Sequence, residues 1–403
     1  MTPEATPERL ARIGRGFASL LAASVALAGC ASLATWIPAV PVPSFDWLWS
    51  SKKPGPLPQI NPTVTPQIAW QVPVGRAGPG LSPAILANAI YAASSSGTIV
   101  RVDPANGQAV WRIQAGKPLS AGVGADHTLV VVGTDKGEVL AFTPEGKPLW
   151  QTKVTSEIVS PPLVADGLVV VWSGDGRTFG LSGADGKTKW IYQRTIPPLT
   201  VRNYSGGYVS RGGLFIGTAG GKLLAMDLAT GNLGWEGNVA TPKGATELER
   251  IADVTSRPVV EERQVCAVAF QGRIACFEIL RGALSWSRDV SSLNGLAVDN
   301  RYMYVTDDKG SVHALDKSTG ASAWKQDKLA LRRPGGPQII GGHVAVVDVE
   351  GYVHLLDPES GNLVGRIPTD GAGATAQPAQ SGPTAVWLTT AGTLFSVGER
   401  PGS

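Results

Sequence analysis

Side chains that could act as nucleophiles or as metal ligands are few and widely spaced in this sequence. The cysteines stand at positions 30, 266 and 276, and the histidines at positions 127, 313, 343 and 354. These residues do not show the spacing of a zinc site, and no Ser or Cys nucleophile motif accompanies the histidines. We therefore expect hydrogen-bonded or solvated histidines, and we expect neither catalytic nor metal-binding residues.

Cys266 and Cys276 flank a turn, and the geometry of that turn decides whether they can form a disulfide. A two-residue turn at Gln271–Gly272 would pair residue 266 with residue 277 and would point the two Cys side chains to opposite faces. A three-residue turn ending at Gly272 would place the two Cys directly opposite each other. The sequence leaves both outcomes open.

Four aspartates, Asp103, Asp227, Asp316 and Asp357, occupy one position of an internal repeat, which suits turn residues better than ligands of a hard cation. The repeat begins with Gly, continues through an apolar residue, Asp, Thr or Ser and a second Gly, and ends with Trp about fourteen residues later. Its members are Gly97–Trp111, Gly137–Trp150, Gly176–Trp190, Gly221–Trp235, Gly272–Trp286 and Gly310–Trp324. A seventh, from Gly351 to Gly365, lacks the Trp.

The length of the repeat predicts an all-β fold. About 40 residues suffice for four short antiparallel strands, which is one blade of a β-propeller. An eighth unit begins at Gly392 and stops with the chain, and its missing Trp strand is found in residues 67–72 near the other end. We therefore expect residues 64–403 to form an eight-bladed β-propeller of four-stranded antiparallel blades, closed by the N-terminal strand. In the unit at residues 120–154 we place strands at 120–125, 128–134, 137–142 and 148–154.

The first thirty residues have the pattern of an export signal. Arg9, Arg12 and Arg15 precede an uncharged, mostly apolar stretch of 13 residues, too short to span a bilayer as a helix. The stretch ends at Leu-Ala-Gly-Cys, which resembles the bacterial lipobox. We interpret residues 1–29 as a signal peptide and Cys30 as the acylated first residue of the mature chain. Ala31 stands where lipoproteins kept in the inner membrane carry Asp, so the resemblance favours the outer membrane.

Residues 30–63 read as the lipidated Cys and a stiff linker with seven prolines. An extended polyproline conformation of this length would reach on the order of 100 Å. The formal charge of the whole chain is only +3 at pH 7. It shows no basic cluster or stripe, which argues against nucleic acid as a partner.

Two neighbouring repeats depart from the usual spacing. Most repeat Trp residues lie 38 to 41 residues apart, but the intervals after Trp190 and Trp235 are 45 and 51 residues. Both insertions fall between the last strand of one blade and the first strand of the next, so both should project from one face of the disc. They bring Leu199, Val201, Arg202 and Asp253 together, a mixture of apolar anchors and charge that is typical of protein-binding patches. In the second, Thr246 is expected to cap a single helical turn.

The repeat resembles the tryptophan-docking repeat of the pyrroloquinoline quinone (PQQ) family. That resemblance raises the alternative of a periplasmic quinoprotein dehydrogenase. Such enzymes resemble one another in an adjacent Cys-Cys pair over the cofactor and in a Glu, Asn and Asp set that holds Ca²⁺. The sequence has no Cys-Cys pair. We therefore expect no cofactor and no enzyme activity.

The lipobox, the Pro-rich linker, the eight repeats and the segments at 198–202 and 247–254 together resemble the BamB family, propeller lipoproteins of the outer-membrane β-barrel assembly (BAM) complex. The resemblance implies a non-enzymatic scaffold on the periplasmic face of the outer membrane that binds the periplasmic POTRA domains of BamA and assists insertion of β-barrel proteins. Leu199, Val201, Arg202 and Asp253 correspond to the family's contact positions. Whether unfolded outer-membrane proteins touch the propeller directly is left open.

Overall fold

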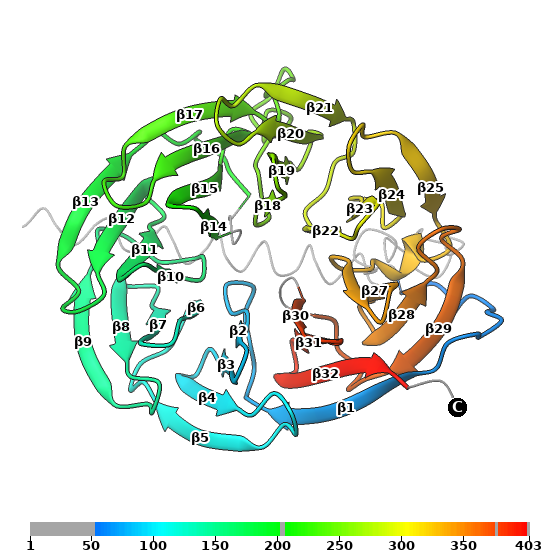
Figure 1. Cartoon of the computed structure of the whole chain (residues 1–403), viewed down its shortest axis with the longest axis horizontal. Coiled ribbons are helices and arrows are strands. Elements are labelled where there is room, and N and C mark those ends of the chain that lie inside the picture. Colours follow the sequence, from blue (N-terminus) through cyan, green and yellow to red (C-terminus); the bar gives the residue numbers. More distant parts are fainter. Residues whose placement is uncertain (1–52, 202–205, 375–377, 401–403) are drawn as a thin grey trace, which may run out of the picture. The chain divides into compact units, whose positions relative to one another are not determined.

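The structure of the chain is a computed structural model that describes residues 53–201, 206–374 and 378–400. In the compact unit Pro54–Ser403, eight four-stranded sheets follow one another around a ring, as Figure 1 shows. The predicted eight-bladed propeller is confirmed. The signal peptide, Cys30 and Arg202 lie outside the described residues. Within the described segments, no helix has the length and apolarity needed to cross a membrane.

Blades are numbered from the first complete one, and their strands A to D run from the axis of the ring to its rim. Blades 1 to 4 contain β2 (Ala84–Leu86), β3 (Ala89–Ala93), β4 (Thr98–Val102), β5 (Ala109–Gln114); β6 (Ala121–Ala125), β7 (Val130–Gly133), β8 (Glu138–Phe142), β9 (Pro148–Lys153); β10 (Leu163–Ala165), β11 (Leu168–Trp172), β12 (Arg177–Ser182), β13 (Thr188–Gln193); and β14 (Gly207–Ser210), β15 (Gly213–Thr218), β16 (Lys222–Asp227), β17 (Leu233–Asn238).

Blades 5 to 8 follow the same order, and a single 3₁₀ turn, η1 (Ala330–Arg332), precedes blade 7. They contain β18 (Val259–Val260), β19 (Gln264–Val268), β20 (Ile274–Glu278), β21 (Leu284–Arg288); β22 (Leu296–Val298), β23 (Tyr302–Thr306), β24 (Val312–Asp316), β25 (Ser322–Gln326); β26 (Gln338–Ile340), β27 (His343–Val347), β28 (Tyr352–Leu356), β29 (Leu363–Pro368); and β30 (Ala379–Ser381), β31 (Thr384–Leu388), β32 (Thr393–Glu399), β1 (Pro66–Pro73).

Burial explains the residue types of the strands. Strand B of a blade lies between two neighbouring blades, and every residue of β3 and of β7 is buried, so these strands are continuous apolar runs. Strand D forms the rim, and β5 and β9 alternate between exposed and partly buried residues. The four strands expected in residues 120–154 are found as β6 to β9, with ends that differ by at most two residues.

The repeated Trp residues fasten each blade to the next, as their predicted packing role requires. Each indole N–H donates to a backbone carbonyl of the following blade: Trp70 to Pro104, Trp111 to Pro144, Trp150 to Gly183, Trp190 to Leu228, Trp235 to Ile279, Trp286 to Lys317 and Trp324 to Pro358. The ring packs on the Gly of the same turn. At Gly107, with φ +74°, an added Cβ would lie 2.5 Å from the Trp70 ring. The repeat therefore needs Gly for space as well as for conformation.

The two ends of the chain share blade 8. Strand β1 pairs antiparallel with β32 from Pro66 opposite Glu399 to Pro73 opposite Thr393, and the two lie side by side in Figure 1. Trp70 on β1 is buried against blade 1. The predicted closure by the N-terminal strand is confirmed.

The seam between blades 7 and 8 is closed without the docking Trp of the repeat. In the other blades the Trp docks on the turn between strands C and D of the next blade, but in blade 8 these are β32 and β1, which no turn connects. Gly365 stands at the Trp position of blade 7, and a Cβ there would lie 2.8 Å from the carbonyl oxygen of Val64. The N-terminal segment thus fills the place that a Trp takes elsewhere.

Residues 54–63, assigned above to the linker, are bound to the propeller instead. The guanidinium of Arg332 donates to the Gly55 carbonyl, and that of Arg366 donates to the Pro58 carbonyl at 2.7 Å. Ile60 packs against the core of blades 6 and 7. Two cations thus supply hydrogen-bond donors to backbone carbonyls of this Pro-rich segment, whose prolines lack the N–H groups needed to form a sheet of its own.

A buried ionic cluster in blade 7 holds this segment. Arg332 is 2% exposed, and its Nε lies 2.6 Å from Asp348, whose other neighbour is the buried His354 at 2.9 Å. Arg366 donates from Nε to His354 Nδ1, so His354 donates from Nε2 to Asp348 as a neutral ring. Burial lowers the pKa of His354. Burial also opposes ionisation of Asp348, but hydrogen bonds from His354 and Arg332 hold the pKa of its carboxyl below the usual value.

Cys266 and Cys276 form a disulfide in blade 5. The Ala269 N–H donates to the Arg273 carbonyl, so the turn between β19 and β20 contains three residues, 270–272. This register places the two Cys opposite each other, the second of the two outcomes left open above. Gln271, with φ +49°, takes the left-handed position of the turn.

Candidate protein-binding site on the insertion loops

Two long loops lie in neighbouring blades on the same face of the disc. The first insertion loop, residues 194–206, joins β13 to β14, and the second, residues 239–258, joins β17 to β18. Both connect a strand D to the next strand A, and we call the side of the disc where these connections lie the insertion-loop face. Turns between strands C and D lie on the opposite face. The placement expected from the repeat spacing is confirmed.

Asp253 joins the two insertion loops. Its carboxylate accepts hydrogen bonds from the Val201 N–H at 2.6 Å and from the Gly220 N–H at 2.8 Å, while its own carbonyl accepts from Phe270. The side chain is completely buried. Burial raises the pKa of the Asp253 carboxyl, and the two N–H donors oppose that rise. In this structure Asp253 thus positions the first loop, and its carboxylate is not at the surface.

The second insertion loop contains the expected helical turn. Thr246 Oγ1 accepts from the Glu249 N–H, and the Glu249 carboxylate accepts from the Thr246 N–H, the reciprocal pair of a capping box. The Arg250 and Ile251 N–H groups close the turn. Leu248 is 67% exposed, whereas Ile251 is partly buried. The cap thus holds a large apolar side chain out into solvent.

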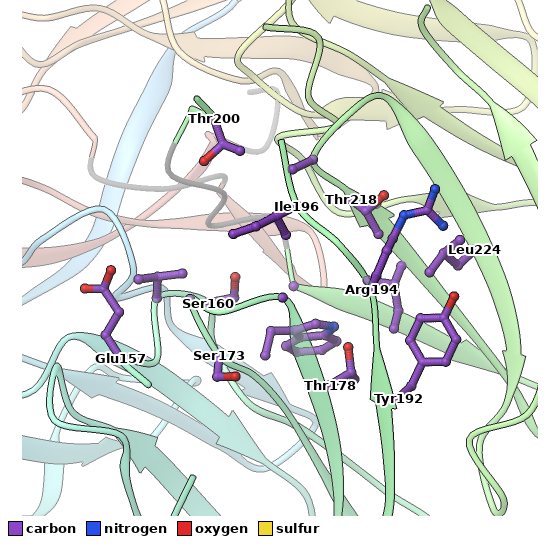
Figure 2. Close-up of a pocket in the computed structure, with 18 of the residues that line it drawn as sticks. Glu157, Ser160, Ser173, Thr178, Tyr192, Arg194, Ile196, Thr200, Thr218 and Leu224 are labelled. Atoms are coloured by element: carbon purple, nitrogen blue, oxygen red, sulfur yellow. The ribbon is translucent and has the colours of Figure 1, made fainter. Parts of the chain in front are cut away.

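The first insertion loop covers a pocket between blades 3 and 4. Leu199 is 42% exposed, while Val201 is partly buried and lines the pocket. The pocket has a volume of about 160 Å³. Figure 2 shows Glu157 and Ser160 on one side of it, Tyr192, Arg194 and Leu224 on the other, and Ile196 between them. The pocket is formed by two consecutive blades and the loop that joins them, through side-chain contacts that the repeat pattern does not specify.

The described residues contain no group of three or more His, Cys, Asp or Glu side chains arranged to hold a metal ion. Three histidines each have one acidic partner, His313 with Asp307, His343 with Glu399 and His354 with Asp348. His127 is exposed. On the insertion-loop face, the exposed side chains of Leu199 and Leu248 could serve as the apolar anchors of a protein-binding site.

These features define a class of protein: an eight-bladed propeller of Trp-docked repeats in which two adjoining loops carry the long insertions. The family model described as "Outer membrane protein assembly factor BamB" matches residues 95–326. The BamB of Nitrosomonas eutropha is 46% identical over 78% of this chain and 76% of the relative. That of Bordetella pertussis is 41% identical over 82% of this chain and 86% of the relative. This chain belongs to the BamB family.

Solved structures agree with the family assignment. The crystal structure of BamB from Moraxella catarrhalis has a TM-score of 0.77 and 26% identity, and it covers 83% of this chain and 99% of that chain. Quinohemoprotein alcohol dehydrogenase from Comamonas testosteroni shares only the fold, with a TM-score of 0.65 and 12% identity over 84% of this chain and 78% of that chain. The enzymes of the alternative interpretation are thus distant neighbours.

Proposed function

We propose that this chain is a non-enzymatic scaffold lipoprotein on the periplasmic face of the outer membrane, which binds the POTRA domains of BamA in the BAM complex through its insertion loops and so assists β-barrel insertion. The observation that carries the proposal is the direct link between the two loops through Asp253, which presents Leu199 and Leu248 on one face. A pre-organised pair of loops loses less conformational entropy when it binds a partner.

The place where the N-terminal segment meets the propeller supports the insertion-loop face as the binding face. Gly55 lies against Leu331 in the connection between blades 6 and 7, which is a D-to-A connection on the insertion-loop face. Cys30 precedes Gly55 by only 25 residues. The described N-terminal segment thus meets the propeller on the same face as the insertion loops.

The double variant Leu199→Ala, Arg202→Ala should lose co-purification with BamA from detergent-solubilised membranes. Truncation of an interface hot spot typically costs about 2 kcal/mol or more, roughly 30-fold in affinity. Its melting temperature should stay close to that of the parent, because Leu199 is exposed on a loop.

The matched control is Leu280→Ala, Arg281→Ala in the turn between β20 and β21. This turn also presents an exposed Leu and an exposed Arg, but on the opposite face. The control should co-purify normally. Equal recovery of BamA with the loop variant and the control would contradict the proposed binding face.

The lipid anchor is tested separately. Growth with a radioactive fatty acid should label the parent chain, and Cys30→Ala should remove the label, because Cys30 is the Cys that ends the export signal. Two lipid chains or more are needed for stable anchoring, so the variant should also leave the membrane fraction. Label that persists in the Cys30→Ala chain would show that the lipobox interpretation is wrong.

A further inference from the structure

The channel along the propeller axis contains a charge that no other described side chain compensates. The inner strands of all eight blades line a cavity of about 950 Å³, among them β2, β6, β10 and β14. Of the described residues that line it, Arg257 alone is charged. Cavities that bind small organic molecules typically measure about 300–1,000 Å³, so this channel has the size of a ligand site.

Arg257 breaks the repeat at this position. Five blades have a Pro directly before strand A, and the residue before that Pro is Ser82, Pro161, Arg257, Gly336 or Gln377. Four of these five residues are uncharged. Because a Ser or Gly serves the same backbone position in other blades, the fold does not require the guanidinium.

Arg257 has no ion-pair partner among the described side chains. Among the described residues, no hydrogen bond or ion pair involves its side chain. The Arg257 side chain is exposed to the solvent of the channel. The channel wall carries apolar side chains, among them Ile85, Leu163, Val259 and Leu296, together with uncharged polar ones. Because Arg257 is the one charged residue among the described residues that line the channel, it gives the channel a positive potential that attracts anions.

We propose that the axial channel binds an organic anion, whose carboxylate or phosphate group pairs with Arg257 and whose apolar part lies against the channel wall. Carboxylate and phosphate both match the planar guanidinium, which can donate two parallel hydrogen bonds. The apolar side chains of the wall favour a ligand with a hydrocarbon portion over a bare ion. This inference does not depend on BamA binding, since Arg257 and the channel are measured with the purified chain alone.

The test is isothermal titration calorimetry on residues 31–403 with decanoate and decyl phosphate, each below its micelle concentration. Both should bind, and the tighter of the two identifies the head group as carboxylate or phosphate. Decanol lacks the charge and acetate lacks the tail, so each should bind at least about tenfold more weakly. Arg257→Gln should lose about tenfold or more in affinity for the tighter ligand. Arg257→Lys keeps the charge, so its affinity should lie between that of the parent and that of Arg257→Gln.

Arg281→Gln, on the opposite face of the same blade, is the control and should bind as the parent does. Without ligand, Arg257→Gln should melt no lower than the parent, because its side chain contributes no ion pair among the described residues. Unchanged affinity in Arg257→Gln, equal binding of decanol and decanoate, equal binding of acetate and decanoate, or no binding at millimolar ligand would each overturn the proposal.

Discussion

The Arg332→Ala variant should lose about 3–5 kcal/mol of its free energy of unfolding, the cost typical of removing one partner from a buried ion pair. Asp348 is fully buried, and without Arg332 its charge would be held only by His354 and backbone N–H groups. The Gly55 carbonyl would also lose its donor. Urea unfolding followed by Trp fluorescence measures the loss.

Arg301→Ala is the control for this effect. Arg301 pairs with Glu359 at a similar distance, 2.9 Å, but both side chains are more than half exposed. Exposed pairs contribute about 0–1 kcal/mol. If the two variants are destabilised equally, the buried cluster does not stabilise blade 7 in the way that its geometry indicates.

Removing strand β1 should prevent cooperative folding of the propeller. A chain that begins at residue 76 lacks β1, one of the two strands that pair with β32, and also lacks Trp70, whose ring fastens blade 8 to blade 1. Loss of one buried Trp side chain alone costs about 3–5 kcal/mol, against a typical total stability of about 5–15 kcal/mol. The truncated chain would also expose β32 as an open edge, which promotes aggregation.

The comparison is with a chain that begins at residue 54, which keeps the complete compact unit. This chain should show one sharp thermal transition by circular dichroism, whereas the chain from residue 76 should show a broad, low-temperature loss of structure or precipitate. A third chain, beginning at residue 66, keeps β1 and removes the segment on blade 7. Its melting temperature should fall between the two. Identical melting of the chains from 54 and 76 would contradict closure by β1.

The repeat could be recognised in the sequence because every blade uses the same turn and the same Trp contact. The Gly of each turn needs a left-handed conformation and space for a Trp ring, and both demands show as residue types at a constant spacing. The two insertion loops were readable for the same reason, as departures from that spacing. The sequence therefore predicted the all-β class, the number of blades, the closing strand and the common face of Leu199 and Asp253.

Contacts between distant segments were not readable. The role of Asp253 depends on Val201 and Gly220, which are 52 and 33 residues away, so its burial could not be inferred from its own neighbourhood. The disulfide depended on whether the turn between β19 and β20 has two or three residues. Local propensity does not distinguish the two strand registers that these turns produce.

The N-terminal segment shows the same division most clearly. By itself the sequence determined that residues 54–63 lack a helix or strand pattern, because proline removes backbone donors and fixes φ. Only the tertiary structure decided that these residues belong to the propeller. The carbonyls of Gly55 and Pro58 accept hydrogen bonds from Arg332 and Arg366. These two donors lie about 280 to 310 positions further along the chain. Pairing between such distant positions depends on how the blades close into a ring, which no local pattern records.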